Sequence, residues 1–125
     1  MENGNYANYD GQDFDSMPPV VVKTLPEAGA RDVSPGLAEI RVTFSKEMQD
    51  GSWSWSNAWE DCTPELIEPP KYEMDKRTCV VKVKFSPNKN YGFWLNSENF
   101  TNFRDAQGRP AVPYLLTFRT RNGAE

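Results

Sequence analysis

The sequence predicts an all-β sandwich of about seven antiparallel strands. Residues 38–45 and 112–120 both alternate apolar and polar side chains, which is the pattern of a strand that covers a core with one face. Clusters of proline, glycine and aspartate separate the strand-like runs at intervals of roughly 8 to 12 residues. That number and spacing of strands are typical of an immunoglobulin-like sandwich.

The individual strands follow from the same two signals. In the segment 38–45, Ile40, Val42 and Phe44 share one face, while the polar residues between them share the other. The first strand follows two prolines, and we expect it at an edge of its sheet. The proline-bearing stretch 62–70 is expected to be a loop. In chain order we expect strands at residues 20–24, 38–45, 51–59, 72–74, 78–85, 91–95 and 112–120.

These strand faces predict one apolar core between the two sheets. Replacing Val42 or Phe118 with aspartate is expected to unfold the domain, because a charge there would have neither solvent nor a partner. The predicted core residues are Ile40, Val42, Phe44, Val81, Val83, Phe93, Leu116 and Phe118.

Tyr91 begins a late strand a few residues after Pro87. This arrangement predicts a tyrosine corner, in which the hydroxyl group bonds back to upstream backbone; the alternative is an ordinary core tyrosine. An antibody-type domain is not expected, because no cysteine lies on the strand at 38–44 to pair with one near Tyr91.

Negative charge is concentrated at the amino-terminal end of the chain. The net charge is −4, and residues 1–17 contain four acidic side chains and no lysine or arginine. We therefore expect residues 1–17 to be a disordered acidic linker or tail, and residues 18–122 to form the Ig-like domain. The body is neutral, which argues against nucleic acid as a partner, because phosphate binding needs clustered lysine and arginine.

Composition excludes most familiar catalytic and metal sites. The chain has no histidine, so it cannot form Ser-His-Asp or Cys-His arrangements or histidine-containing metal sites. It has no glycine-rich phosphate loop, and no apolar run approaches the roughly 20 residues that a membrane-spanning helix needs. We expect no catalytic residue, cofactor, metal ion or membrane insertion, and we expect a monomer.

Acidic residues gather between positions 60 and 68, and they could bind calcium or act as an acid–base pair. Solvated loop charge is the preferred interpretation, because they lack the tight alternating spacing of calcium loops. The group consists of Glu60, Asp61, Glu65 and Glu68.

The two cysteines, Cys62 and Cys79, leave a disulfide and free thiols as alternatives. A disulfide between them would add about 3 kcal/mol of stability, but the loop that carries Cys62 would have to dip toward the core. Free thiols are the preferred interpretation. Two thiols without a histidine or a Cys-x-x-Cys pair do not predict a zinc site.

Several segments, taken in order, resemble the bacterial Ig-like domain of the SbsA type, a family named for S-layer proteins. They are residues 20–24, 26–33, 40–48, 87–91, 105–108 and 116–120, and the resemblance spans nearly everything from Pro19 to Arg121. It implies a seven-stranded sandwich that serves as a repeat, spacer or accessory module of bacterial envelope or secreted proteins, without catalysis of its own. The tryptophan-rich segment 51–59 and the single copy depart from the family pattern and put a spacer-array role in doubt.

The resemblance also favours an extracellular or cell-envelope location. Residues 1–17 lack the basic start and the apolar run of a secretory signal. A small cytosolic protein that starts at Met1 and a module cut from a longer exported chain are both consistent with the sequence.

The excess of tryptophan is the feature that suggests binding. Trp94 is expected on the outer face of its strand, and Trp53 and Trp55, which share one face of theirs, can join it in a patch. Core packing is the first interpretation, a docking surface for another domain or protein is the second, and a platform for sugar rings is the third. The candidate partner or glycan residues are Trp53, Trp55, Trp59 and Trp94. The predicted function is a non-catalytic accessory or interaction module, and the alternative is a carbohydrate-binding module that uses exposed tryptophans.

Overall fold

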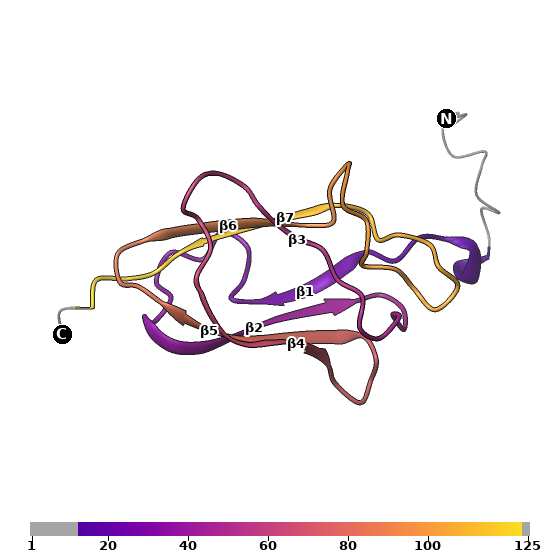
Figure 1. Cartoon of the computed structure of the whole chain (residues 1–125), viewed down its shortest axis with the longest axis horizontal. Coiled ribbons are helices and arrows are strands. Elements are labelled where there is room, and N and C mark those ends of the chain that lie inside the picture. Colours follow the sequence, from indigo (N-terminus) through magenta and orange to yellow (C-terminus); the bar gives the residue numbers. More distant parts are fainter. Residues whose placement is uncertain (1–12, 124–125) are drawn as a thin grey trace.

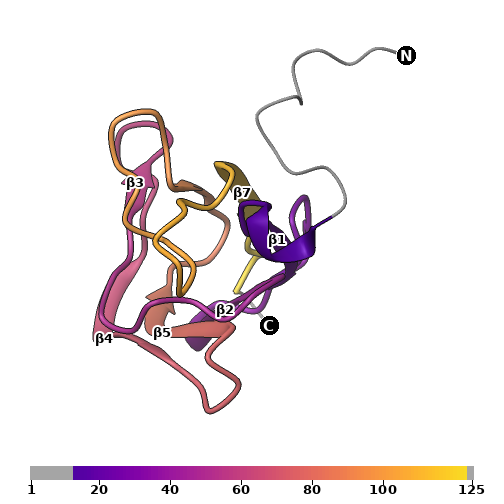
Figure 2. The ribbon, with the colours of Figure 1, turned by 90° about the vertical axis from the view of Figure 1, so that its right-hand side faces the viewer.

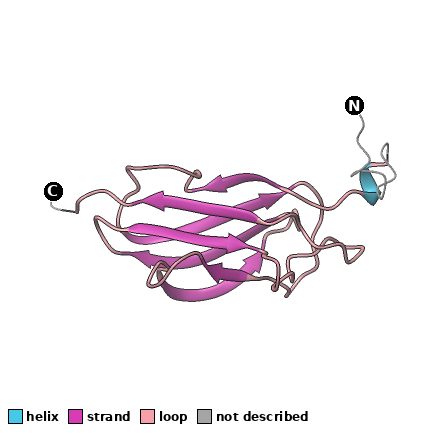
Figure 3. Cartoon of the chain, turned by 90° about the horizontal axis from the view of Figure 1, so that it is seen from above, coloured by secondary structure: helices cyan, strands magenta, loops and turns pink. Residues whose placement is uncertain are grey.

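The computed structural model describes residues 13–123 and confirms the predicted all-β fold. The strands are β1 (Val21–Leu25), β2 (Gly36–Phe44), β3 (Trp55–Asn57), β4 (Glu65–Tyr72), β5 (Thr78–Phe85), β6 (Asn90–Leu95) and β7 (Tyr114–Arg119), and a 3₁₀ helix at Phe14–Ser16 precedes them. One antiparallel sheet has the order β1-β2-β5-β4, and the other has the order β3-β6-β7. The two sheets form separate layers (Figure 1), and their strands run along the long axis of the molecule (Figure 3).

The core fills the space between the two sheets. All eight residues predicted for it are buried there in one cluster, so the predicted inner faces are confirmed. In β5 the alternation is clear, because Val81 and Val83 are buried while Lys82 and Lys84 are exposed. Loops add further buried side chains to the cluster, among them Phe103.

The predicted loop at residues 62–70 is wrong. β4 begins within this segment and ends at Tyr72, so the short strand expected at 72–74 is also misplaced. β4 is an edge strand, so an N–H missing from its outward side breaks no ladder. The register with β5 shifts between Glu68 and Lys71, which accommodates the two consecutive prolines, Pro69 and Pro70.

The strand expected at 51–59 is much shorter in the structure. Only β3, with three residues, pairs with β6. The first strand, in contrast, lies at the edge of its sheet as predicted.

The tyrosine corner is confirmed. The Tyr91 hydroxyl group accepts a hydrogen bond from the backbone N–H of Ser86 at 2.7 Å, five residues upstream. Its ring packs between those of Phe85 and Phe118, with centroids 5.2 and 5.7 Å away. The corner therefore ties the β5–β6 connection to the core.

Residues 13–17 belong to the segment expected to be a disordered acidic linker or tail, and they contact the sandwich. The Lys46 ammonium donates hydrogen bonds to the backbone carbonyls of Asp15 (3.0 Å) and Met17 (2.9 Å), and Arg109 donates a third to the Asp15 carbonyl at 2.8 Å. Residues 1–12 of the expected tail lie outside the described residues.

Cys62 and Cys79 are both buried and both free, in agreement with the preferred interpretation. No helix between residues 13 and 123 is long and apolar enough to cross a membrane. In the same described range, no group of three or more cysteine or acidic side chains is placed to hold a metal ion.

Candidate functional site

The four tryptophans lie on two different surfaces of the sandwich. Trp53 and Trp55 point between the sheets and pack against the core. Trp94 lies on β6 between the buried Phe93 and Leu95, so it faces outward as predicted, and Trp59 lies above the same outer face. The expectation that Trp53 or Trp55 joins Trp94 in a patch is therefore wrong.

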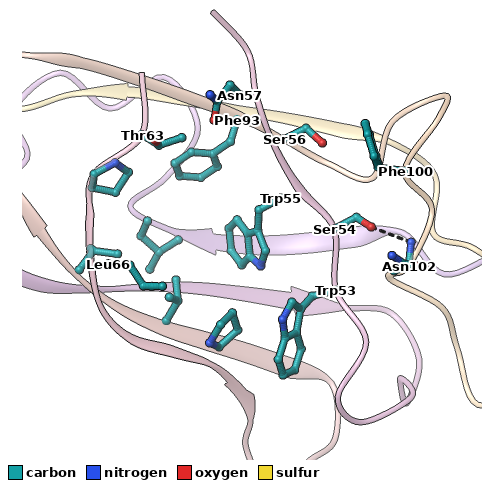
Figure 4. Close-up of a pocket in the computed structure, with 15 residues that line it drawn as sticks. Trp53, Ser54, Trp55, Ser56, Asn57, Thr63, Leu66, Phe93, Phe100 and Asn102 are labelled. Carbon is teal, nitrogen blue, oxygen red and sulfur yellow. Dashed lines mark hydrogen bonds between the residues drawn. The ribbon is translucent and has the colours of Figure 1, made fainter. Parts of the chain in front are cut away.

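Trp53 and Trp55 line a groove between the two sheets, with a volume of about 770 Å³. The groove opens along one side of the molecule, where the edge strands β3 and β4 lie on the same side (Figure 2). Its floor is the aliphatic core itself, and the two tryptophans lie along the wall opposite Leu66 (Figure 4). The lining residues are Ile40, Trp53, Ser54, Trp55, Ser56, Asn57, Thr63, Pro64, Leu66, Pro70, Val81, Val83, Phe93, Phe100 and Asn102.

Both indole rings are fixed by aromatic neighbours. The Trp55 ring meets those of Phe93 and Phe103 edge-on, at centroid distances of 5.4 and 5.6 Å. The Trp53 ring packs on that of Tyr72 at 6.3 Å. Aromatic pairs of this kind contribute stability in addition to the burial of their surface, so both rings are held in place and this wall of the groove is preformed.

The serine between the two tryptophans anchors their segment to the loop that follows β6. The buried Ser54 hydroxyl group accepts a hydrogen bond from the Asn102 backbone N–H at 2.9 Å (Figure 4), and the Ser54 carbonyl accepts one from the Asn96 N–H at 3.0 Å. The fully buried Asn96 side chain in turn bonds the backbone of Phe103 and Ala111. Ser54 thus fixes this segment to the loop, while Trp53 and Trp55 turn their rings toward the groove.

The lining of the groove is uncharged. None of the described residues that line it is ionisable, although Leu66 and Phe100 are 59% and 57% exposed at its mouth. Two buried polar atoms near the tryptophans, Trp55 Nε1 and Tyr72 Oη, have no hydrogen-bond partner within residues 13–123. Burial raises the pKa of Tyr72 above its ordinary value, so this hydroxyl group stays neutral.

Glu60, Asp61, Glu65 and Glu68 lie in residues 58–68, a segment that leads into β4 and includes its first residues. All four are exposed, and residues 58–68 include no lysine or arginine. Two of them form exposed ion pairs with lysines, because Lys82 Nζ lies 3.7 Å from a carboxylate oxygen of Glu68 and Lys89 Nζ lies 3.5 Å from one of Asp61. Glu65 and Glu68 lie opposite Lys84 and Lys82 in the register of β4 with β5, so neighbouring lysines balance the negative charge of this strand.

The second surface is built on the outer face of β6. A Cβ atom at Gly92 would lie 2.4 Å from two ring atoms of Trp59, so the absence of a side chain there makes room for the ring. Cys62 holds this loop in place, because its thiol donates to the Gly92 carbonyl at 2.8 Å and its carbonyl accepts from the Gly92 N–H at 3.1 Å. Trp94 lies two residues further along β6 on the same face as Gly92, and Leu115 on β7 is the register partner of Trp94. Trp59, Trp94 and Leu115 form what we call the outer patch.

A family model described as a bacterial Ig-like domain matches residues 15–120. The chain belongs to this family. Bacterial Ig-like domains are generally non-catalytic accessory modules, and the match covers every strand of the sandwich described here. A search of curated proteins finds no match.

The sequence indicated the tryptophans as candidate binding residues of this bacterial Ig-like domain, but it did not reveal the other residues that line the groove with them. Leu66 lies in the stretch 62–70 that was expected to be a loop, Phe100 lies between two expected strands, and Gly92 has no side chain that could indicate a role. Leu66 carried a usable signal, since it belongs to an apolar pair, Leu66–Ile67, between acidic residues. The closeness of Phe100 to the groove depends on the fold of the loop after β6.

Proposed function

We propose that this bacterial Ig-like domain is a non-catalytic interaction module of an envelope or secreted protein, and that it binds another domain of its parent protein or another protein through the groove. The observation that carries the proposal is the preformed, uncharged groove with Trp53 and Trp55 on one wall and the exposed Leu66 and Phe100 at its mouth. The resemblance to the SbsA type supports the envelope or secreted setting.

The chemistry of the groove favours recognition over catalysis. General acid–base or nucleophilic catalysis needs a titratable or nucleophilic group aimed at the substrate, whereas the described lining offers hydroxyl groups, amides and apolar surface. Apolar anchors in a fixed aromatic wall are the usual centres of binding energy in protein interfaces. The groove therefore suits a partner that inserts apolar side chains.

The test is binding of the separately expressed remaining domains of the parent protein, measured by calorimetry. Leu66→Ser removes an exposed apolar side chain from the groove and should weaken binding at least tenfold, because interface anchors contribute about 1.4 kcal/mol or more. Leu37→Ser is the matched control, since Leu37 is 77% exposed on β2 and does not line the groove. Equal binding by both variants would refute the proposal.

Carbohydrate binding is the second candidate, and the outer patch favours it. Trp59 is held against Gly92 and is 43% exposed, and Trp94 lies on the same face, so two indoles are available for stacking on sugar rings. Titration of soluble glucans and chitin fragments, followed by tryptophan fluorescence, tests this role. Trp94→Ala should abolish the signal, whereas Leu66→Ser should leave it unchanged.

A further inference from the structure

We propose that residues 13–20 form a rigid strap, held by the buried Lys46 side chain, that fixes the direction in which the chain enters the domain. The 3₁₀ helix at Phe14–Ser16 lies at one end of the long axis, and the yellow carboxy-terminal end of the described chain lies at the other (Figure 1 and Figure 3). The strap therefore decides how this end of the domain is joined to the residues before it. None of residues 13–20 lines the groove, so the inference is independent of the proposed function.

The Lys46 ammonium group has three N–H donors, and the strap supplies two of their three acceptors. These donors bond to the carbonyls of Asp15 and Met17 at 3.0 and 2.9 Å and to Asp105 Oδ2 at 2.8 Å. The Phe14 ring covers the ammonium group, with its centroid 5.8 Å from Nζ. Lys46 is only 7% exposed, so detaching the strap would leave a buried charged group with two unsatisfied donors until water reached it.

Hydrogen bonds continue along the strap up to the start of β1. The Pro19 carbonyl accepts from the Val112 N–H at 3.0 Å. The Val20 N–H donates to the Ser45 hydroxyl group at 3.0 Å, and the Val20 carbonyl accepts from the Ser45 N–H at 2.9 Å. Residues 18 and 19 are both proline, whose ring fixes the backbone angle φ. Because the carbonyls of residues 15, 17, 19 and 20 all have partners, the strap has no free stretch in which a hinge could form.

The anchors of the strap come from both sheets. Lys46 follows β2 of the four-stranded sheet, whereas Arg109, which donates to the Asp15 carbonyl at 2.8 Å, lies in the loop before β7 of the three-stranded sheet. The two loops are joined to each other, because the Ala106 N–H donates to the Glu47 carbonyl at 3.0 Å. The strap is therefore attached to the sandwich as a whole and not to one loop.

NMR relaxation and residual dipolar couplings of the full chain measure whether the strap is rigid. We expect backbone order parameters of about 0.85 for the amides of residues 14–17, as in the strands. Their dipolar couplings should fit the same alignment as those of the strands, because the strap has a fixed direction. Order parameters below about 0.6, or couplings that do not fit this alignment, would overturn the inference.

Lys46→Met combined with Asp105→Asn tests the role of Lys46 without leaving an unpaired buried charge. The double variant loses both hydrogen bonds from the ammonium group to the strap, so the order parameters of residues 14–17 should fall below about 0.6 while those of the strands stay unchanged. Asp105→Asn alone is the matched control, because it keeps both of these hydrogen bonds, and its strap should stay ordered. A strap that stays ordered in the double variant, or that is lost in the control, would refute Lys46 as its anchor.

Arg109→Ala provides a second test that leaves the ion pair of Lys46 and Asp105 in place. Arg109 is only half-buried and contributes one of the hydrogen bonds to the Asp15 carbonyl, so the strap should keep order parameters of about 0.85 at residues 16 and 17. A fall below about 0.6 at these residues would show that Arg109, and not Lys46, holds the strap. The unchanged protein and Arg109→Ala both retain the buried pair, so these two measurements decide the inference even if the double variant does not fold.

Discussion

Asp105→Asn is expected to destabilise the domain by about 3 kcal/mol, because it breaks a buried ion pair. The Asp105 side chain is fully buried, and its Oδ2 accepts a hydrogen bond from Lys46 Nζ at 2.8 Å. Its Oδ1 accepts from the backbone N–H groups of Arg109 and Gln107, at 2.8 and 3.0 Å. An asparagine keeps an oxygen for these two amides but turns an NH₂ group toward a lysine that is only 7% exposed.

The expected loss of about 3 kcal/mol depends on the hydrogen bonds that Lys46 retains in the variant. Removing one partner of a buried ion pair costs about 3 to 5 kcal/mol, and the lower end applies because the ammonium retains the carbonyls of Asp15 and Met17 as acceptors. At about 4 °C per kcal/mol for a domain of this size, the melting temperature should fall by about 12 °C. Thermal and urea unfolding followed by circular dichroism measure both values.

A loss below about 1 kcal/mol would refute this reasoning, because that is the range of exposed pairs. Glu73→Gln, which breaks the exposed pair between Glu73 and Arg41, is the matched control and should stay within that range. In a double-mutant cycle, Lys46→Met combined with Asp105→Asn should cost less than the sum of the single changes.

The same ion pair predicts the acid sensitivity of the domain. Burial by itself raises the pKa of Asp105, but the hydrogen bonds from Lys46 and from the backbone amides of Arg109 and Gln107 outweigh it and hold this pKa below its ordinary value. The contribution to stability is therefore complete above the unfolded-state pKa of about 3.9 and is lost as the pH falls through the lower folded-state value. In Asp105→Asn the decline in stability below about pH 4 should be shallower than in the unchanged protein.

Three further substitutions and one reactivity measurement test other parts of the structure. Tyr91→Phe should lower the free energy of unfolding by about 1 to 2 kcal/mol, because the Tyr91 hydroxyl group accepts a hydrogen bond from a backbone amide. Tyr72→Phe should leave stability unchanged or raise it, because it removes a buried hydroxyl group that has no partner in the described part of the chain. Urea unfolding of the two variants compares these effects. Gly92→Ala should lower the free energy of unfolding by about 1 to 3 kcal/mol or displace the Trp59 ring. A shift in tryptophan fluorescence would report the displacement. Unchanged stability and unchanged fluorescence would contradict the close contact. Burial raises the pKa of Cys79 to about 12, so this thiol should not react with Ellman's reagent at pH 8 until the protein unfolds.

The sequence by itself determined the strands whose faces differ in polarity. In β2, Ile40, Val42 and Phe44 alternate with polar residues, and side chains in an extended chain must point alternately to the two faces. The tyrosine corner was predictable for a similar reason, because Tyr91 reaches a backbone amide only five residues away. Such features depend on local geometry, which the order of residues specifies directly.

The tertiary structure decided what depends on partners distant in the chain. β4 forms through a prolyl segment because β5 supplies hydrogen bonds along one of its edges, and the sequence of β4 alone predicts a loop. The period of two placed Trp53 and Trp55 on a common face, but only the pairing of β3 with β6 turns that face toward Phe93 and into the groove. Periodicity specifies which side chains point the same way, whereas their surroundings depend on how the two sheets pack.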